Sequence, residues 1–251
     1  MAPQKKYDDF ELLDPPPPNS WCASSPFVSE SNAHVKNMGY TKTCMCWSER
    51  ASAASLIAGT VTIAICCWHF ASVGRDDLVA ILLGWQCGLL MQIPEWVEWR
   101  NLRLGQRSDI TAPAAFWLNV LQPMAIIGSS WYVTKRPPTL ALGLSAVYAM
   151  AFLADRDQVA TAVRRGIAPR GQCSHLNLDD WWSKPRTVLF HAIAIAAFAQ
   201  LPPRLAWLNI LIFEGTFAYA LTVKCGTSSV WCWSIFVAGI ATWLAWRLGL
   251  V

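Results

Sequence analysis

Residues 51–71, ASAASLIAGTVTIAICCWHFA, contain no Asp, Glu, Lys or Arg. About 20 consecutive, mostly apolar residues form a helix long enough to cross the hydrocarbon core of a bilayer. Similar runs follow along the chain, and we expect seven spans, near 51–71, 78–99, 111–133, 138–154, 187–201, 205–223 and 229–248. The fifth run is short and stops at Pro202-Pro203, so six crossings are the alternative. The sequence therefore predicts an all-α, polytopic transmembrane helix bundle.

The composition supports a membrane environment. Of the 251 residues, 54% are hydrophobic and only 14% are charged, whereas soluble domains carry about 25% charged residues. Fifteen tryptophans fit the aromatic belts found at membrane interfaces. The net charge of +4 is too small for a nucleic-acid-binding surface. We therefore expect the lipid bilayer as the main partner and no nucleic acid.

The first 46 residues differ from the rest of the chain. They lack an apolar period and contain Pro15-Pro16-Pro17-Pro18, a run that favours polyproline II over helix. We therefore divide the chain into a polar, Pro-rich tail, 1–46, and a transmembrane domain, 47–251. With seven spans, the tail and the loops on its side hold fifteen of the twenty basic residues. Because basic residues favour the cytoplasmic side, we expect a multi-pass protein whose N-terminus is cytoplasmic, or on the equivalent side of an organelle.

Polar side chains inside the spans are the candidate functional residues. An ionisable group at the centre of a membrane helix costs at least about 2.5 kcal/mol and usually faces protein or water. Glu214 is predicted near the midplane, in one layer with Gln86, Asn119 and Gln122. A second layer near the cytoplasmic boundary contains Gln92, Glu95 and His191. The alternative is that Gln92, Asn119 and Gln122 only join helices by hydrogen bonds.

Pro94 lies between Gln92 and Glu95 in the second predicted span. Proline has no N–H, so a carbonyl one turn earlier loses its usual donor. Irregular backbone at membrane depth is tolerated where it lines a cavity or is buried in protein. The sequence therefore predicts a break in this helix next to the second polar layer.

Cysteine and histidine residues on the predicted cytoplasmic side are candidate zinc ligands, because four such ligands satisfy a tetrahedral site. They are Cys44, Cys46, Cys173, His175 and Cys232. One residue separates Cys44 from Cys46, which is fewer than in most zinc modules. Acylation of these two cysteines beside the first span, or ordinary packing, are the alternatives.

No catalytic motif accompanies these residues. The sequence has no Gly-x-Ser-x-Gly elbow, no phosphate-binding Gly-rich loop before Lys-Ser/Thr, and no pair of His residues one helical turn apart. The last predicted span has no Lys for a retinal Schiff base. We therefore do not expect an enzyme.

Several short motifs occur in a recognisable order. They are Cys46-Trp47-Ser48, Met91-Gln92-Ile93-Pro94-Glu95-Trp96, Leu121-Gln122-Pro123, His175-Leu176 and Ser229-Val230-Trp231-Cys232-Trp233. Their order resembles a poorly characterised family of small multi-pass membrane proteins of algae, large algal viruses and bacteria. The long Pro-rich tail and Pro94 within the Gln-Glu motif depart from that pattern. The resemblance implies a shared multi-pass fold and no particular activity.

Two functional classes are compatible with these observations. The first is a transporter, channel or small-ligand binder with a polar pathway from Gln92 and Glu95 toward Gln122 and Glu214. The second is a non-catalytic subunit of a larger membrane complex, in which Trp residues pack against protein, lipid or pigment and the tail docks on partners. A polar site that reaches Glu214 would favour the first class.

Overall fold

The computed structural model describes residues 49–103, 110–154, 167–170, 173–176, 184–222 and 235–251. The described residues are almost entirely helical, which confirms the all-α class. The helices are α2 (Glu49–Ser72), α3 (Asp76–Leu89), α4 (Gln92–Arg103), α5 (Thr111–Thr134), α6 (Thr139–Ala154), α8 (Lys184–Phe198), α9 (Pro203–Thr222) and α11 (Phe236–Arg247). Most of these ranges lie close to the predicted apolar runs, but the second run is divided between α3 and α4, and α8 is displaced by three residues from the fifth run. Residues 229–234 of the last run lie outside the described residues.

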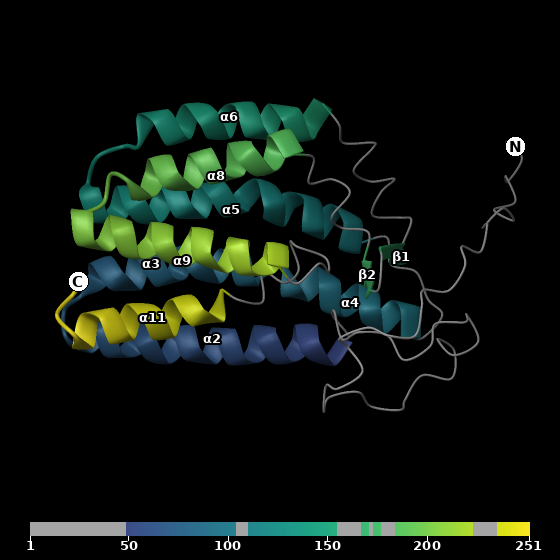
Figure 1. Ribbon diagram of the computed structural model, residues 1–251, viewed down its shortest axis with the longest axis horizontal. Helices are drawn as coiled ribbons and strands as arrows, with labels where there is room; N and C mark the ends of the chain where they lie inside the picture. The colour runs from purple at the N-terminus through teal and green to yellow at the C-terminus, as the bar shows by residue number, and fades with distance from the viewer. Residues whose placement is uncertain (1–48, 104–109, 155–166, 171–172, 177–183, 223–234) are drawn as a thin grey trace, which may run out of the picture.

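The helices run side by side and alternate in direction (Figure 1). Helix α3 packs between α2 and α5, and α8 packs on α5 and α6. Helix α9 lies against α8, and α11 packs against α2 and α9. The α2–α3, α5–α6 and α8–α9 turns therefore lie at the same end of the bundle as Val251 (Figure 1). We call this end the turn end.

Local sequence explains the tight turns at the turn end. Gly74 adopts φ +71° between α2 and α3, a left-handed conformation that costs glycine little. Lys135 closes α5 in the left-handed region, at φ 55°, and its N–H bonds to the Trp131 carbonyl. Pro203 begins α9, where a missing N–H and a fixed φ suit the first helical position.

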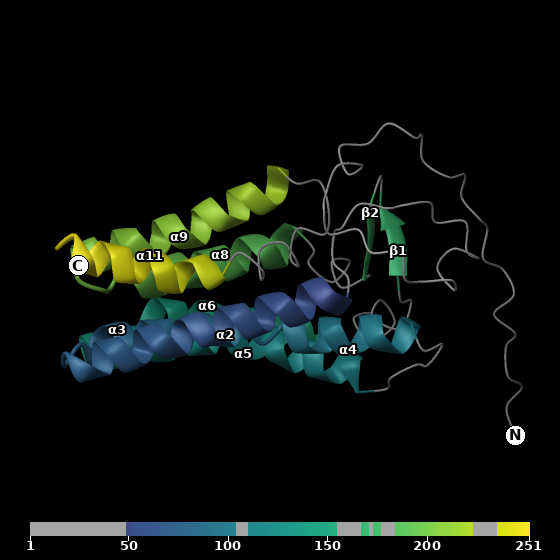
Figure 2. The same cartoon turned by 90° about the horizontal axis from the view of Figure 1, so that it is seen from below.

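The second predicted span is two helices. The break lies at Leu90 and Met91, before Pro94, and α4 then extends beyond the bundle (Figure 2). Pro94 is the third residue of α4, a position where no helical hydrogen bond needs its nitrogen. The Leu90 carbonyl accepts the Ile93 N–H at 3.0 Å, so it has a partner. The expected break is therefore present, and the Leu90 carbonyl lacks its usual donor at residue 94, as expected, but bonds to the Ile93 N–H instead.

A two-stranded antiparallel ladder is the exception to the helical fold. Strand β1 (Ile167–Arg170) pairs with β2 (Cys173–Leu176), with Ala168 opposite His175. The sequence analysis did not predict these strands, because four-residue segments in a polar loop show no clear alternation of apolar side chains.

Aromatic side chains fill the centre of the bundle. Phe213 stacks on Phe190 with ring centroids 5.8 Å apart, and Trp85 stacks on Phe198 at 5.9 Å. Helices α3 and α5 approach closely, because a Cβ at Gly84 would lie 2.8 Å from the Ser129 hydroxyl. This core holds helices from both halves of the chain in one bundle.

The outer surface of the bundle is also apolar. On α2, the exposed residues Ile57, Val61, Ile65 and Trp68 form one stripe at intervals of three or four residues. Only 28% of the most apolar stretch of α2 is buried. Other helices likewise expose large apolar side chains, among them Leu140, Val147 and Met150 on α6 and Trp207 and Leu211 on α9.

Two stretches of the described residues are both long and apolar enough to cross a membrane, Ser52–Ser72 and Asp76–Val97. Helices α6 and α8 have shorter apolar segments, Thr139–Ala154 and Pro185–Phe198. Because a buried helix of a water-soluble protein can meet the same criterion, the exposure of α2 is the more informative observation.

Candidate functional site

The side chains of His191 on α8 and Glu214 on α9 are within hydrogen-bond distance of each other. Nδ1 of His191 lies 2.8 Å from Oε1 of Glu214. His191 is seven residues from each end of α8, and Glu214 is eleven residues after Pro203 and eight before Thr222. Because α8 and α9 run in opposite directions, their central residues meet at the same level (Figure 1). The two side chains therefore lie near mid-length of the bundle.

Aromatic rings surround the His191 imidazole. The Phe217 ring centroid lies 4.2 Å from that of His191, and the Phe213 centroid lies 5.0 Å away; both contacts are edge-to-face. The His191 side chain is 13% exposed, whereas that of Glu214 is 40% exposed. The pair therefore has a shielded base on the inside and a carboxylate that reaches the outer surface between the helices.

The pair is isolated from other charges along the helices. Apart from these two residues, no Asp, Glu, Lys, Arg or His occurs in 51–68, 78–94, 111–134, 137–154, 187–203, 205–222 or 235–246. The remaining charged residues of the described helices lie toward the two ends. In a bilayer, His191 and Glu214 would therefore be the ionisable groups of the described residues at mid-depth.

The structure distributes the predicted polar layers differently. We expected Glu214 with Gln86, Asn119 and Gln122, and His191 with Gln92 and Glu95. The predicted fifth span starts at residue 187, but α8 starts at Lys184, which places His191 deeper, at the level of Glu214. Gln86 instead donates to the Thr60 hydroxyl at 3.0 Å on the side facing α2.

Asn119 is buried and bonds locally. Its Nδ2 donates to the Ala115 carbonyl at 3.1 Å and lies 3.8 Å from the Met91 sulfur. A bond one turn back on the same helix satisfies the amide without recruiting a solute. This geometry agrees better with a structural role for Asn119 than with a place on a pathway.

Gln92 and Glu95 belong to a buried polar cluster between α2 and α4. The Ser55 hydroxyl donates to Oε1 of Gln92 at 3.0 Å. Gln92, Glu95, Ser52 and Ser55 are all at most 3% exposed. This cluster lies at the end of the bundle opposite the turn end, where α4 leaves it (Figure 1).

Gln122 faces a small cavity in the centre of the bundle. Trp85, Phe190 and Phe213 also line this cavity, whose volume is about 10 Å³. Neither amide atom of Gln122 has a hydrogen-bond partner among the described residues, although the side chain is 98% buried. A volume of this size holds about one water molecule. It does not by itself connect Glu95 with Glu214.

The sequence analysis missed Asn209. Its side-chain oxygen accepts the Trp85 indole N–H at 2.9 Å, and its nitrogen donates to the Leu205 carbonyl at 2.8 Å. Both side chains are buried, so this bond joins α3 to α9 in the core. Asn209 could have been found by the same signal that identified Glu214, because it too is a polar residue within a predicted apolar span.

Most of the zinc candidates lie outside what the structure describes. Cys44, Cys46 and Cys232 are outside the described residues, as is the tail of 1–46; Cys173 and His175 lie on β2. Within the described part of the chain, no three His, Cys, Asp or Glu side chains gather closely enough to hold a metal ion.

Comparisons with protein-family models, with curated proteins and with solved structures find no significant match to this chain.

Proposed function

We propose that this chain is a multi-pass integral membrane protein whose functional centre is the His191–Glu214 pair. The observation that carries the proposal is the outer stripe Ile57, Val61, Ile65 and Trp68 on α2, together with the absence of other Asp, Glu, Lys, Arg and His residues from the central stretches of the described helices. Helix α2, with 24 residues, is about 36 Å long, which is enough to cross a hydrocarbon core of about 30 Å. A water-soluble protein rarely exposes such contiguous apolar surface.

The activity that fits this centre is the binding or transport of a small solute, coupled to the uptake or release of a proton. The 2.8 Å contact between Nδ1 of His191 and Oε1 of Glu214 gives a direct route along which one proton can pass between the two side chains. Because 40% of the Glu214 side chain is exposed at mid-length of the bundle, where hydrocarbon would surround it, a membrane-soluble hydrogen-bond donor can approach it. His191 then holds or releases the proton that this ligand displaces.

Proton flux into proteoliposomes tests this proposal. Vesicles loaded with a pH-sensitive dye are given a pH gradient, and valinomycin with K⁺ removes the membrane potential as a limit. We expect faster acidification with wild type than with empty vesicles, and loss of the excess rate in Glu214→Gln. Glu49→Gln is the matched control, because it removes a carboxylate at the start of α2, outside the apolar stretch. Equal rates for wild type and Glu214→Gln would refute the proposal.

Glu95→Gln separates a local site from a longer pathway. If the pathway includes the Gln92–Glu95 cluster, this variant also loses the excess flux. If the site is confined to α8 and α9, its flux equals that of wild type.

The alternative is a subunit of a larger membrane complex, with its tail docked on partners. It is favoured by the same exposed carboxylate, since Trp207, Leu211 and Glu214 share one face of α9 where a helix of another protein could pair with it. In that case Glu214→Gln leaves flux unchanged but releases a partner that co-purifies with wild type in mild detergent.

A further inference from the structure

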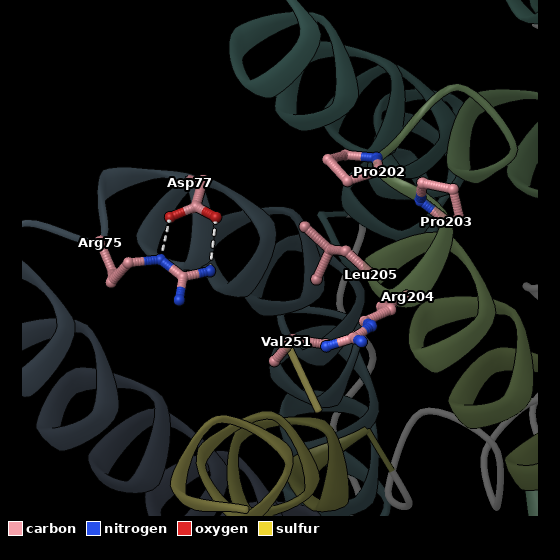
Figure 3. Close-up of a pocket in the computed structure, with 7 residues that line it drawn as sticks. All are labelled: Arg75, Asp77, Pro202, Pro203, Arg204, Leu205 and Val251. Carbon is pink, nitrogen blue, oxygen red and sulfur yellow. Dashed lines mark hydrogen bonds and ion pairs between the residues drawn. The ribbon is translucent and has the colours of Figure 1, made fainter. Parts of the chain in front are cut away.

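A second site lies at the turn end, between the α2–α3 turn, the start of α9 and the segment after α11. Here a cavity of about 380 Å³ is lined by Arg75, Asp77, Pro202, Arg204, Leu205 and Val251 (Figure 3). This volume falls in the range of small-molecule sites, about 300–1,000 Å³. In the view of Figure 3, Leu205 lies between the Arg75–Asp77 pair and Arg204. Both charged and apolar side chains therefore line the cavity.

Arg75 is held in place by Asp77. Nε and Nη2 of Arg75 donate to the two oxygens of Asp77 at 2.9 and 2.8 Å. This paired bond fixes the guanidinium plane and raises the pKa of Arg75 above its ordinary value. The N–H groups of Nη1 on Arg75 take no part in this paired bond, so they remain to contact a ligand.

Arg204 forms no salt bridge with an Asp or Glu side chain among the described residues. Its Nη1 donates to the Gly249 carbonyl at a long 3.4 Å, which uses one of the five donors of the guanidinium. The charged side chains that line the cavity are Arg75, Arg204 and Asp77. Lys135, Arg136 and Arg247 add positive charge to the turn end, against Asp76 and Asp77.

We propose that this cavity binds a phosphate group attached to an apolar chain or in free form, with Arg204 as its principal ligand. Guanidinium matches phosphate in charge and in geometry, because two parallel N–H groups can bond two oxygens. Leu205, Pro202 and Val251 offer an apolar surface to carbon atoms next to the phosphate. At the end of a membrane bundle, a phospholipid headgroup is one source of such a group. Only this lipid source depends on the membrane setting proposed above.

The test is thermal unfolding and native mass spectrometry of the full chain in detergent micelles. The probes are phosphatidylglycerol, phosphatidylcholine and inorganic phosphate. We expect phosphatidylglycerol to raise the unfolding temperature of wild type and to remain bound in the mass spectrometer. Arg204→Gln should weaken this binding by about tenfold, the effect of removing one charged hydrogen-bonded pair. Arg136→Gln is the matched control, because it removes the same charge from the same end without lining the cavity.

The outcomes separate the sources and the alternatives. An equal stabilisation by millimolar inorganic phosphate would identify a free phosphate as sufficient and would still support the site. If Arg204→Gln and Arg136→Gln weakened phosphatidylglycerol binding equally, the lipid would be held by a general attraction to positive charge at this end of the bundle. That result would overturn the proposal. The proposal would also be overturned if wild type retained neither phosphatidylglycerol nor phosphatidylcholine and were not stabilised by inorganic phosphate. This measurement does not depend on the folding of a variant. Stable, detergent-free recovery of a chain that binds inorganic phosphate would refute the membrane proposal and leave this one standing.

Discussion

Replacing Val61 by Asp tests whether lipid or water surrounds the bundle. Val61 is twelve residues after Glu49 and eleven before Ser72, so it marks the centre of α2, and it is 51% exposed. In a bilayer, Asp at a helix centre costs about 2.5 to 3.5 kcal/mol for insertion, whereas Val contributes about −0.3 kcal/mol. The substitution therefore shifts insertion by about 3 to 4 kcal/mol, on the order of a few hundredfold. Asp is also too short to extend its charge to the interface.

In water the same substitution has little effect. A charge at an exposed surface position usually changes stability by less than about 0.5 kcal/mol and improves solubility. The two environments thus predict clearly different results for Val61→Asp.

The assay is the fraction of full-length chain that stays with membranes after an alkaline carbonate wash. We expect wild type and Val61→Leu to stay in the membrane pellet and Val61→Asp to be largely lost or degraded. Ile110→Asp, at a 77% exposed position just before α5, is the control, because it places the same charge at the end of the bundle. Unchanged pelleting of Val61→Asp, or recovery of wild type as a monodisperse protein without detergent, would refute the reasoning.

Two further predictions concern buried amides, both read as the thermal midpoint in detergent. Asn209→Ala leaves the Trp85 indole N–H without its acceptor in the core. The free energy of unfolding should therefore fall by about 1 to 3 kcal/mol, which lowers the midpoint. An unchanged midpoint would mean that the bond contributes nothing to stability. Gln122→Met keeps the side-chain volume but removes two amide atoms that have no partner among the described residues, so the midpoint should rise. A fall would show that the amide does form bonds, for example to a water in its cavity.

The region around Pro94 shows how far local sequence rules extend. Proline predicted a break in the second apolar run, and a break exists. Its position at Leu90 and Met91, and the Ile93–Leu90 hydrogen bond that satisfies the carbonyl, follow from Pro94 lying in the first turn of a new helix. Residue type alone does not distinguish a proline that interrupts a helix from one that begins it.

The candidate site shows a similar division. Glu214 and His191 were recognisable because ionisable residues are costly within apolar runs. Their pairing could not be recognised from the sequence, because it depends on where α8 starts. A shift of three residues moves His191 by about 4.5 Å along the helix axis. The charged cavity at the turn end was not recognisable either, since Arg75 and Arg204 are 129 positions apart and meet only through helix packing.

The sequence by itself determined most of the helical segments and their approximate ends, because runs of apolar residues bounded by Gly, Pro and charged residues are local signals, but it did not predict β1 and β2. It also identified the ionisable residues that a nonpolar surrounding would make functional candidates. Only the tertiary structure decided which polar groups meet: His191 with Glu214, Ser55 with Gln92, Trp85 with Asn209. These pairings depend on the rotation and axial offset of each helix against its neighbours, which are set by side-chain packing between residues distant in the chain.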